Sequence, residues 1–431
     1  MQKNKPLRFF ITTTLAVTCF LSAQLSYAED ASDISSTAAL LAGGAVAGAG
    51  IGIAASGHAG SNPEDKSFCD LNCRTYLQKK LDDYRIKNNI PAMTMTVNKG
   101  DATLNFYSGT MAKNSSVPVD QNSLFEIGSV TKTLTAVIIL QLEAESKLNI
   151  EDKISKYLPE YSGWGNITIK QLLNMTGGAY DYSDDAFVDK MFTNPEHILS
   201  WKEVLDRAYY HIPNTDFAPG TKLEYSNTNY TLAGLIIERV THKTFKENLE
   251  TRISRPLGLK HTLYDPNLIP SHLSNMVHGY WEIPDSYYNT DTTNQAVGSF
   301  CNSGGGVIST AEDTAKWTRA LFSTHRLLPE KQFQEMKILV GADGAPLPPD
   351  PQTPGFSLGM EWYPLRAFGF DLPGGAWDKG GQTMGYVHYW QYFPERDFII
   401  TTATDVVSDA SLRNAYFGIE VFNYLLITRK I

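Results

Sequence analysis

The stretch FEIGSVTK, residues 125–132, carries more information about the fold than any other part of this chain. Apolar residues follow it on nearly every side of a helix up to Leu148, which predicts a helix that is buried all round. Ser129 lies at the start of this helix, and Lys132 lies one turn later on the same face. A serine hydroxyl needs a base within hydrogen-bond reach, and burial can turn a lysine into one by lowering its pKa. The pair therefore predicts a nucleophile and its base, although Ser-x-x-Lys alone also fits a helix cap followed by a solvated lysine.

A second motif, YSN at residues 225–227, follows the turn signal FAPG at 217–220 and precedes a helical pattern at 231–240. A tyrosine phenol near a lysine ammonium ionises more easily, so Tyr225 could carry a proton from the serine to a leaving group. The amide of Asn227 could bind a substrate carbonyl and orient the lysine. A packed aromatic residue beside a turn asparagine is the alternative interpretation.

A third motif, KGG at residues 379–381, precedes a predicted strand at 385–393. Its glycines would let a substrate backbone approach the strand edge, and Lys379 would attract a carboxylate. Lys-Gly-Gly is also an ordinary loop tripeptide, so this motif gains weight only beside the other two.

Strand patterns stand at both ends of the predicted domain, and helical patterns fill its middle. This order predicts an α/β lobe built from both ends of the domain, with an inserted helical lobe. The predicted helices include 74–87 and 410–426, the strands are 93–97, 104–107, 385–393 and 398–404, and a long surface loop is predicted at 339–356.

The three motifs, in this order, resemble those of the serine β-lactamase and penicillin-binding-protein superfamily. The similarity is closest to its branch of class C β-lactamases, D-alanyl-D-alanine carboxypeptidases and esterases. It extends from about Cys69 to the C-terminus and includes LLNMTGG at 172–178, NTNYTLAG at 227–234 and GGGVIST at 304–310. The resemblance implies an α/β fold with an antiparallel sheet flanked by helices, and a helical lobe at roughly 130–296 beside the active site.

The same resemblance implies roles for individual residues. Ser129 would be the nucleophile, with Lys132 and Tyr225 as general base and acid. Neither a metal ion nor an organic cofactor is implied. The residues implied in substrate binding are Asn227, Lys379, Gly381 and Gln382, and the backbone N–H groups of Ser129 and Gln382 would form the oxyanion hole.

One position departs from the pattern of this superfamily. Typical β-lactamases and many carboxypeptidases have Lys-Thr-Gly as the third motif, whereas this chain has Gly380 in place of the threonine. The positive charge of Lys379 is kept, but one hydrogen bond to a substrate carboxylate is lost. A substrate with a carboxylate and a less selective esterase are therefore both compatible with the motif.

Residues 1–28 have the features of a secretory signal peptide. Three basic residues precede an apolar stretch at 9–23, and in Ser26-Tyr27-Ala28 the first and third residues are small, at the positions that a signal peptidase reads. An uncleaved membrane anchor is the alternative, but the modest apolar core favours cleavage. We therefore expect an exported protein, either periplasmic or secreted.

Residues 29–68 form a separate segment before the predicted hydrolase domain at 69–431. Within the segment, 38–57 has no charged residue and carries Gly44, Gly48 and Gly52 at a spacing of four. Small residues at this spacing allow apolar helices to pack closely in a membrane, whereas the glycine content disfavours a helix in water. Both a spacer and a membrane-associating segment remain possible.

Charge and cysteine content restrict the possible partners and the compartment. The formal net charge of −9 argues against a nucleic acid partner. Cys69 and Cys73 are one helical turn apart, so an oxidising compartment could join them, which leaves Cys301 as a single buried thiol. The isolated histidines His278 and His388 fit structural roles, and the acidic residues from Asp181 to Asp185 fit a solvated loop.

Two classes of function follow. The first is an exported serine hydrolase that acts through an acyl-enzyme on D-amino-acid peptides, small esters or β-lactams. Its partner would be a small-molecule or peptide substrate, for example one derived from peptidoglycan, because Lys379 favours a free carboxylate. The second is a binding or assembly protein of the same fold without useful turnover, tethered through residues 38–57.

Overall fold

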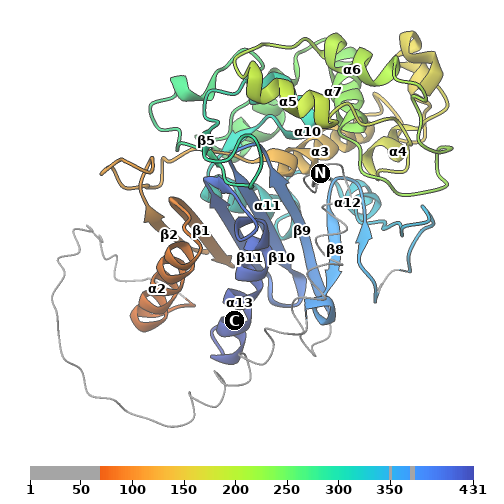
Figure 1. The fold of residues 1–431 in the computed structure, drawn as a ribbon. Helices are drawn as coiled ribbons and strands as arrows, with labels where there is room; N and C mark the ends of the chain where they lie inside the picture. The colour runs from red at the N-terminus through yellow and green to blue at the C-terminus, as the bar shows by residue number, and fades with distance from the viewer. Residues whose placement is uncertain (1–67, 349–351, 369–373) are drawn as a thin grey trace, which may run out of the picture. The chain divides into compact units, whose positions relative to one another are not determined.

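The computed structural model describes residues 68–348, 352–368 and 374–431, and its centre is one antiparallel sheet (Figure 1). The seven strands follow the order β2-β1-β11-β10-β9-β8-β7, so the hairpin from the start of this part of the chain pairs with a strand near its end. This confirms the predicted fold class. The strands are β1 (Ala92–Lys99), β2 (Ala102–Gly109), β7 (Gly355–Phe356), β8 (Glu361–Pro364), β9 (Gly375–Gln382), β10 (Val387–Phe393) and β11 (Phe398–Thr404).

Helices cover both faces of this sheet. Helix α13 (Asn414–Ile427) packs on one face, where a Cβ atom placed on Gly418 would lie 3.4 Å from Ile400. The next residue along β11, Thr401, donates to the carbonyl of Ala311 in α11 (Ala311–Phe322). Successive strand residues point to opposite faces, so α11 covers the other face. Helix α2 (Leu71–Lys87) lies beside α13, since the rings of Tyr76 and Tyr424 stack at 3.9 Å.

The helices of the middle of the chain gather at one end of the sheet, with α3 (Thr131–Ala144) inside (Figure 1). Every residue of α3 is buried except Gln141, Glu143 and Ala144, as the apolar pattern predicts. The helix ends earlier than predicted, because Ser146 adopts a positive φ of 57°. The other helices here are α4 (Ile169–Leu173), α5 (Asp185–Thr193), α6 (Trp201–Tyr209), α7 (Asn227–Thr241), α8 (Phe245–Leu249), α9 (Arg255–Leu257), α10 (Val297–Gly305) and α12 (Glu330–Met336).

Three predicted elements differ from the structure in their bounds. The KGG motif lies inside strand β9, which the sequence pattern does not predict. The strand predicted at 385–393 is β10. Helix α7 begins at Asn227, four residues before the helical pattern, and α13 begins at Asn414 after a 3-10 turn at Ser411–Arg413. The described part of the predicted loop at 339–356 ends in the short strand β7.

The two neighbouring cysteines are joined at the start of α2. A disulfide connects Cys69 and Cys73, and the intervening Asp70 caps the helix by accepting from the backbone N–H of Cys73 at 2.9 Å. Cys301 is a free thiol, and burial raises its pKa to about 12. The predicted signal peptide and the segment 38–57 lie outside the described residues. None of the helices that the structure describes is both long and apolar enough to cross a membrane.

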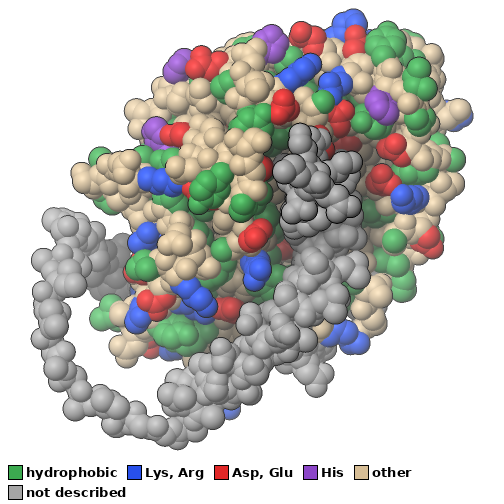
Figure 2. Space-filling view, in the orientation of Figure 1, with side chains coloured by type: hydrophobic (Ala, Val, Ile, Leu, Met, Phe, Trp, Pro, Cys, Tyr) green, Lys and Arg blue, Asp and Glu red, His purple; other side chains and the backbone are tan. Residues whose placement is uncertain are grey.

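Charged side chains of both signs are interspersed over the described part of the face in Figure 2. Ion pairs at the surface join residues one turn apart in a helix, for example Lys79 with Asp83 in α2 and Lys202 with Asp206 in α6. Such pairs contribute little to stability individually. The buried ion pair at β9, described below, is of a different kind.

Candidate active site

A tight turn presents Ser129 at the start of α3. Residues Gly128–Val130 form a 3-10 turn, in which Gly128 adopts a φ of 50°, a conformation that favours glycine. The turn packs directly against strand β9. A Cβ atom on Gly128 would lie 2.6 Å from the backbone nitrogen of Gln382, and a Cβ atom on Gly381 would lie 2.7 Å from the nitrogen of Ser129. Side chains at these two positions would force the turn and the strand apart.

The hydroxyl of Ser129 has two close polar neighbours. The Nζ of Lys132 lies 3.0 Å from Ser129 Oγ, and the phenol of Tyr225 donates to the same oxygen at 2.5 Å. The lysine comes from the first turn of α3, and the tyrosine comes from the segment that leads into α7. The structure thus brings together the three residues that the first two motifs singled out, at distances suited to proton transfer.

Lys132 is fully buried and is held by neutral oxygens. Its Nζ donates to Oδ1 of Asn227 and to the backbone carbonyl of Gly304, both at 2.7 Å. Burial holds the pKa of Lys132 well below that of an ordinary lysine, and the nearby charge of Lys379 lowers it further. Burial therefore shifts Lys132 toward the neutral amine, the form that can accept a proton from Ser129.

The pKa of Tyr225 is shifted in the opposite direction, upward. The sequence predicts that a neighbouring ammonium lets the phenol ionise more easily, but burial is the dominant influence and raises the pKa of Tyr225. The phenol therefore holds its proton more firmly than an ordinary tyrosine does. Its ring lies close to both lysines of the site, with its centroid 4.8 Å from Nζ of Lys132 and 5.3 Å from Nζ of Lys379.

Asn227 connects Lys132 to an acidic segment between α4 and α5. Its Nδ2 donates to Oγ of Ser183 at 2.9 Å and lies 3.5 Å from a carboxylate oxygen of Asp181. Asp181 itself accepts from the backbone and the hydroxyl of Ser183, and burial raises its pKa. The prediction of a solvated acidic loop is therefore wrong for Asp181. Asp184 also has a structural role, since it caps α5 and pairs with Arg207.

The β9 side of the site contains a second buried lysine. Lys379 is only 2% exposed, and its Nζ binds Oε1 of Glu361 on the neighbouring strand β8 at 2.5 Å. The sequence motifs do not include Glu361, because the contact depends on the pairing of β8 with β9. The predicted carboxylate-binding lysine is thus already paired with a carboxylate of the protein.

The two glycines after Lys379 have different neighbours. A Cβ atom on Gly381 would lie 1.9 Å from the carbonyl oxygen of Ile127, so this position requires glycine for the close approach to the Ser129 turn. A Cβ atom on Gly380 would lie 2.4 Å from the ring of Tyr389 on β10. The ring therefore occupies the space that a threonine side chain would need at position 380.

The two histidines noted in the sequence, and Trp377 beside the third motif, take structural positions. His388 is fully buried, and burial lowers its pKa to about 3, so its imidazole is neutral. His278 forms a contact of 2.7 Å with Asp291 at the surface. Trp377 packs against Trp362, with ring centroids 5.3 Å apart, and is 8% exposed.

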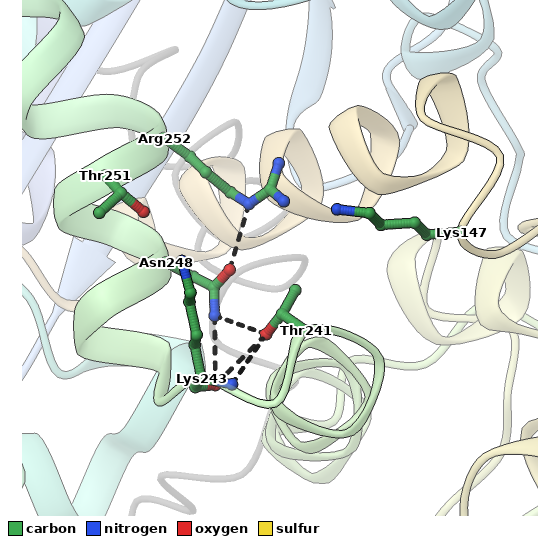
Figure 3. Close-up of a pocket in the computed structure, with 6 residues that line it drawn as sticks. All are labelled: Lys147, Thr241, Lys243, Asn248, Thr251 and Arg252. Atoms are coloured by element: carbon green, nitrogen blue, oxygen red, sulfur yellow. Dashed lines mark hydrogen bonds between the residues drawn. The ribbon is translucent and has the colours of Figure 1, made fainter.

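A separate pocket lies between α7, α8 and the end of α3 (Figure 3). Asn248 is at its centre: Nδ2 donates to Oγ1 of Thr241 at 2.9 Å, and Oδ1 accepts from Arg252 at 3.1 Å. Arg252 also pairs with Glu145 at 2.6 Å. These polar groups satisfy one another and join neighbouring helices, and we assign the pocket no catalytic role. Within the described residues, no group of three or more His, Cys, Asp or Glu side chains is arranged to hold a metal ion.

The sheet, the helical part and the Ser129 turn define a protein of the β-lactamase and transpeptidase-like class. The chain belongs to the Beta-lactamase family, whose model matches residues 77–417. The predicted superfamily is therefore confirmed.

Individual relatives are distant. Penicillin-binding protein 4* of Bacillus subtilis (strain 168) is 28% identical over 258 residues, which cover 58% of this chain and 56% of that protein. Protein flp of Staphylococcus aureus (strain MW2) is 31% identical over 228 residues, which cover 48% of this chain and 44% of that protein. The chain thus spans about half the length of the curated relatives it matches.

Solved structures match a larger part of the chain. A D-stereospecific amidohydrolase from Streptomyces sp. has 25% sequence identity and a TM-score of 0.66, and the match covers 80% of this chain and 98% of that one. The D-amino acid amidase from Ochrobactrum anthropi SV3, at 22% identity, has a TM-score of 0.68 with coverage of 82% and 99%. At this identity the second similarity shows the fold alone.

Proposed function

We propose that this protein is an exported serine hydrolase that forms an acyl-enzyme on Ser129 with amide or ester substrates. The observation that carries the proposal is the position of Ser129 Oγ, 3.0 Å from Lys132 Nζ and 2.5 Å from the Tyr225 hydroxyl. The pKa values of Lys132 and Tyr225 are shifted in opposite directions, which supports different roles for the two groups in proton transfer. The lowered pKa makes the neutral amine of Lys132 more available as a proton acceptor, and the raised pKa keeps Tyr225 protonated, so that it has a proton to pass to the leaving group.

In the proposed reaction, neutral Lys132 takes the proton of Ser129 as Oγ attacks the substrate carbonyl carbon. The negative charge that develops on the carbonyl oxygen faces the backbone N–H groups of Ser129 and Gln382. Tyr225 then gives its proton to the leaving nitrogen or oxygen and recovers one from the Lys132 ammonium, and the bond to the leaving group breaks. Water attacks the resulting ester, its proton returns through the same groups, and Ser129 is released with a carboxylic acid product.

We favour D-amino-acid derivatives as the substrate class and a location outside the cytoplasm, reached by export. The name of the Streptomyces relative, a D-stereospecific amidohydrolase, supports the first point. The signal-like features of residues 1–28 and the disulfide between Cys69 and Cys73 support the second, because disulfides persist mainly in oxidising compartments.

Intact mass measurement tests the catalytic proposal. The purified protein is mixed with p-nitrophenyl acetate and, separately, with benzylpenicillin, and both adduct mass and product release are followed. We expect an adduct or turnover with at least one reagent that is lost in Ser129→Ala and retained in Ser116→Ala, a change at an exposed serine. If the wild type neither reacts with nor consumes either reagent, the proposal fails and the non-catalytic binding protein becomes the better interpretation.

A further inference from the structure

We propose that Glu361 makes this site select acyl donors whose leaving group carries no carboxylate, such as amino acid amides, peptide amides and neutral esters. The inference rests on the proposed function, because it concerns the substrate of the same Ser129 site. It also replaces the expectation that Lys379 recruits a free carboxylate. Glu361 would act by occupying Lys379, and therefore as a determinant of specificity rather than of catalysis.

The first support is the ion pair itself. Lys379 Nζ lies 2.5 Å from Oε1 of Glu361, and the side chains are 2% and 13% exposed. The hydroxyl of Tyr363 donates to the other carboxylate oxygen of Glu361 and so fixes its orientation. A substrate carboxylate could bind the lysine only by displacing a carboxylate that is already bonded and desolvated, which gives little net gain.

The second support is the lack of access to the Lys379 ammonium. The ring of Tyr225 lies 5.3 Å from its Nζ and the ring of Phe356 lies 5.0 Å from it. Tyr225 precedes α7 and Phe356 lies in β7, so aromatic rings from two separate segments lie against the ammonium that Glu361 binds. In contrast to a lysine that reaches into solvent, it offers almost no surface to a ligand.

The third support is the sum of charges around Ser129. The charge of Lys379 is balanced by Glu361, and burial lowers the pKa of Lys132, which shifts it toward the neutral amine. Asp378, opposite Glu361 in the strand pairing, is buried and has its pKa raised to about 8, first by burial and then by the charge of Glu361. The ion pair with Glu361 therefore leaves Lys379 without an unbalanced positive charge for an incoming carboxylate.

The glycine at position 380 removes the other group that could bind a carboxylate. A threonine hydroxyl would require a Cβ atom only 2.4 Å from the Tyr389 ring, so the packing of β9 on β10 excludes it without a shift of that ring. The neutralised lysine and the absent hydroxyl are independent features with the same consequence. Together they favour a leaving group without charge.

A matched pair of substrates tests this inference directly. D-phenylalanyl-glycine and D-phenylalanyl-glycinamide share the acyl group and differ only in the carboxylate of the leaving group. Benzylpenicillin and its methyl ester provide a second pair, read as the rate at which Ser129 gains mass. We expect the wild type to prefer the neutral member of each pair.

Two variants assign the preference to Glu361. In Glu361→Gln the amide oxygen can still accept from Lys379, but the lysine charge is no longer balanced. The ratio of kcat/KM for the acid over the amide should then rise by about tenfold or more, because unit charges a few ångströms apart interact strongly inside a protein. The double variant Glu361→Gln with Lys379→Gln removes both charges and should return the ratio close to that of the wild type. Glu420→Gln, which breaks the ion pair with Lys80 at the surface, should leave the ratio unchanged.

The outcomes separate this inference from the proposed function. A wild type that prefers the acid, or a ratio that does not change in a folded Glu361→Gln protein, would overturn the role of Glu361 while Ser129 chemistry stands. If Glu361→Gln does not fold, the double variant provides the test. A kcat/KM for the acid that equals or exceeds that for the amide in the double variant would also overturn the role of Glu361. If no member of either pair is consumed or modifies Ser129, both this inference and the proposed function fail.

Discussion

Two buried lysines, Lys132 and Lys379, lie near the ring of Tyr225 in the site, and the groups that bind them differ. Lys132 in α3 is bound by neutral oxygens from Ser129, Asn227 and Gly304. Lys379 in β9 is bound by the carboxylate of Glu361. Both are almost completely removed from water. Burial alone therefore does not determine what a lysine does at this site.

The charge of the partner accounts for the difference. A buried ammonium that meets only neutral acceptors loses its hydration without gaining an opposite charge, so the neutral amine is favoured and can serve as a base. A buried ammonium beside a carboxylate has its charge compensated and contributes to the structure instead. The α3 side is thus arranged for proton transfer, and the β9 side is arranged to hold two strands together.

Removal of Lys132 should have the largest effect on activity. In Lys132→Met we expect kcat/KM for ester hydrolysis to fall by about a thousandfold or more, because Ser129 loses its base. The free energy of unfolding should change by less than about 2 kcal/mol, since the desolvation cost of the lysine disappears together with its hydrogen bonds. Kinetics and denaturant titration measure the two effects. A variant that retains more than about a tenth of the activity would contradict the role of Lys132 as the base.

Removal of Lys379 should have its main effect on stability. Lys379→Met leaves the carboxylate of Glu361 buried without its cation, so we expect the free energy of unfolding to fall by about 3 kcal/mol. The double variant with Glu361→Gln should recover most of this loss, because no charge then remains buried. Lys79→Met is the matched control, since Lys79 forms an ion pair with Asp83 that is largely exposed. Equal stability of Lys379→Met and Lys79→Met would contradict the comparison.

The α3 side could be predicted from the sequence because its contacts are set locally. Ser129 and Lys132 are separated by one helical turn, so their proximity follows from helix geometry once the buried helix is recognised. The position of Tyr225 required the resemblance to a known superfamily, because no local rule connects it to α3. The roles of these residues remain predictions, whereas their contacts are present in the structure.

The β9 side could not be predicted in the same way. Glu361 and Lys379 meet only because β8 and β9 pair in one particular register. The register places Glu361 opposite Asp378, so its contact with Lys379 is a diagonal one that no sequence motif encodes. The direction of the Tyr225 pKa shift was also missed, because the sequence indicated a neighbouring ammonium but not that burial would dominate. The contact of Asp181 with Asn227 depends in the same way on how the 177–184 segment folds over α7.

The smallest effect that we predict tests the comparison by giving Lys132 a charged partner. Asn227→Asp places a carboxylate where a neutral oxygen now lies 2.7 Å from Nζ, and an opposite charge raises the pKa of a lysine. In the wild type, burial lowers that pKa, so kcat/KM should rise with pH through a limb below the ordinary lysine value and then level off as the neutral base accumulates. In the variant this limb should move to higher pH by about one unit or more, with an activity loss of about tenfold near neutral pH that is regained in alkali.

Asn227→Ala separates the effect of charge from the loss of a hydrogen bond. It removes the acceptor of Lys132 without adding a carboxylate, so it should lower kcat/KM at all pH values but should not move the limb upward. Measurement of kcat/KM against pH for the three proteins distinguishes the two effects. If the limb of Asn227→Asp coincides with that of the wild type, the group that titrates is not Lys132. The neutral environment of this lysine would then not be what distinguishes it from Lys379.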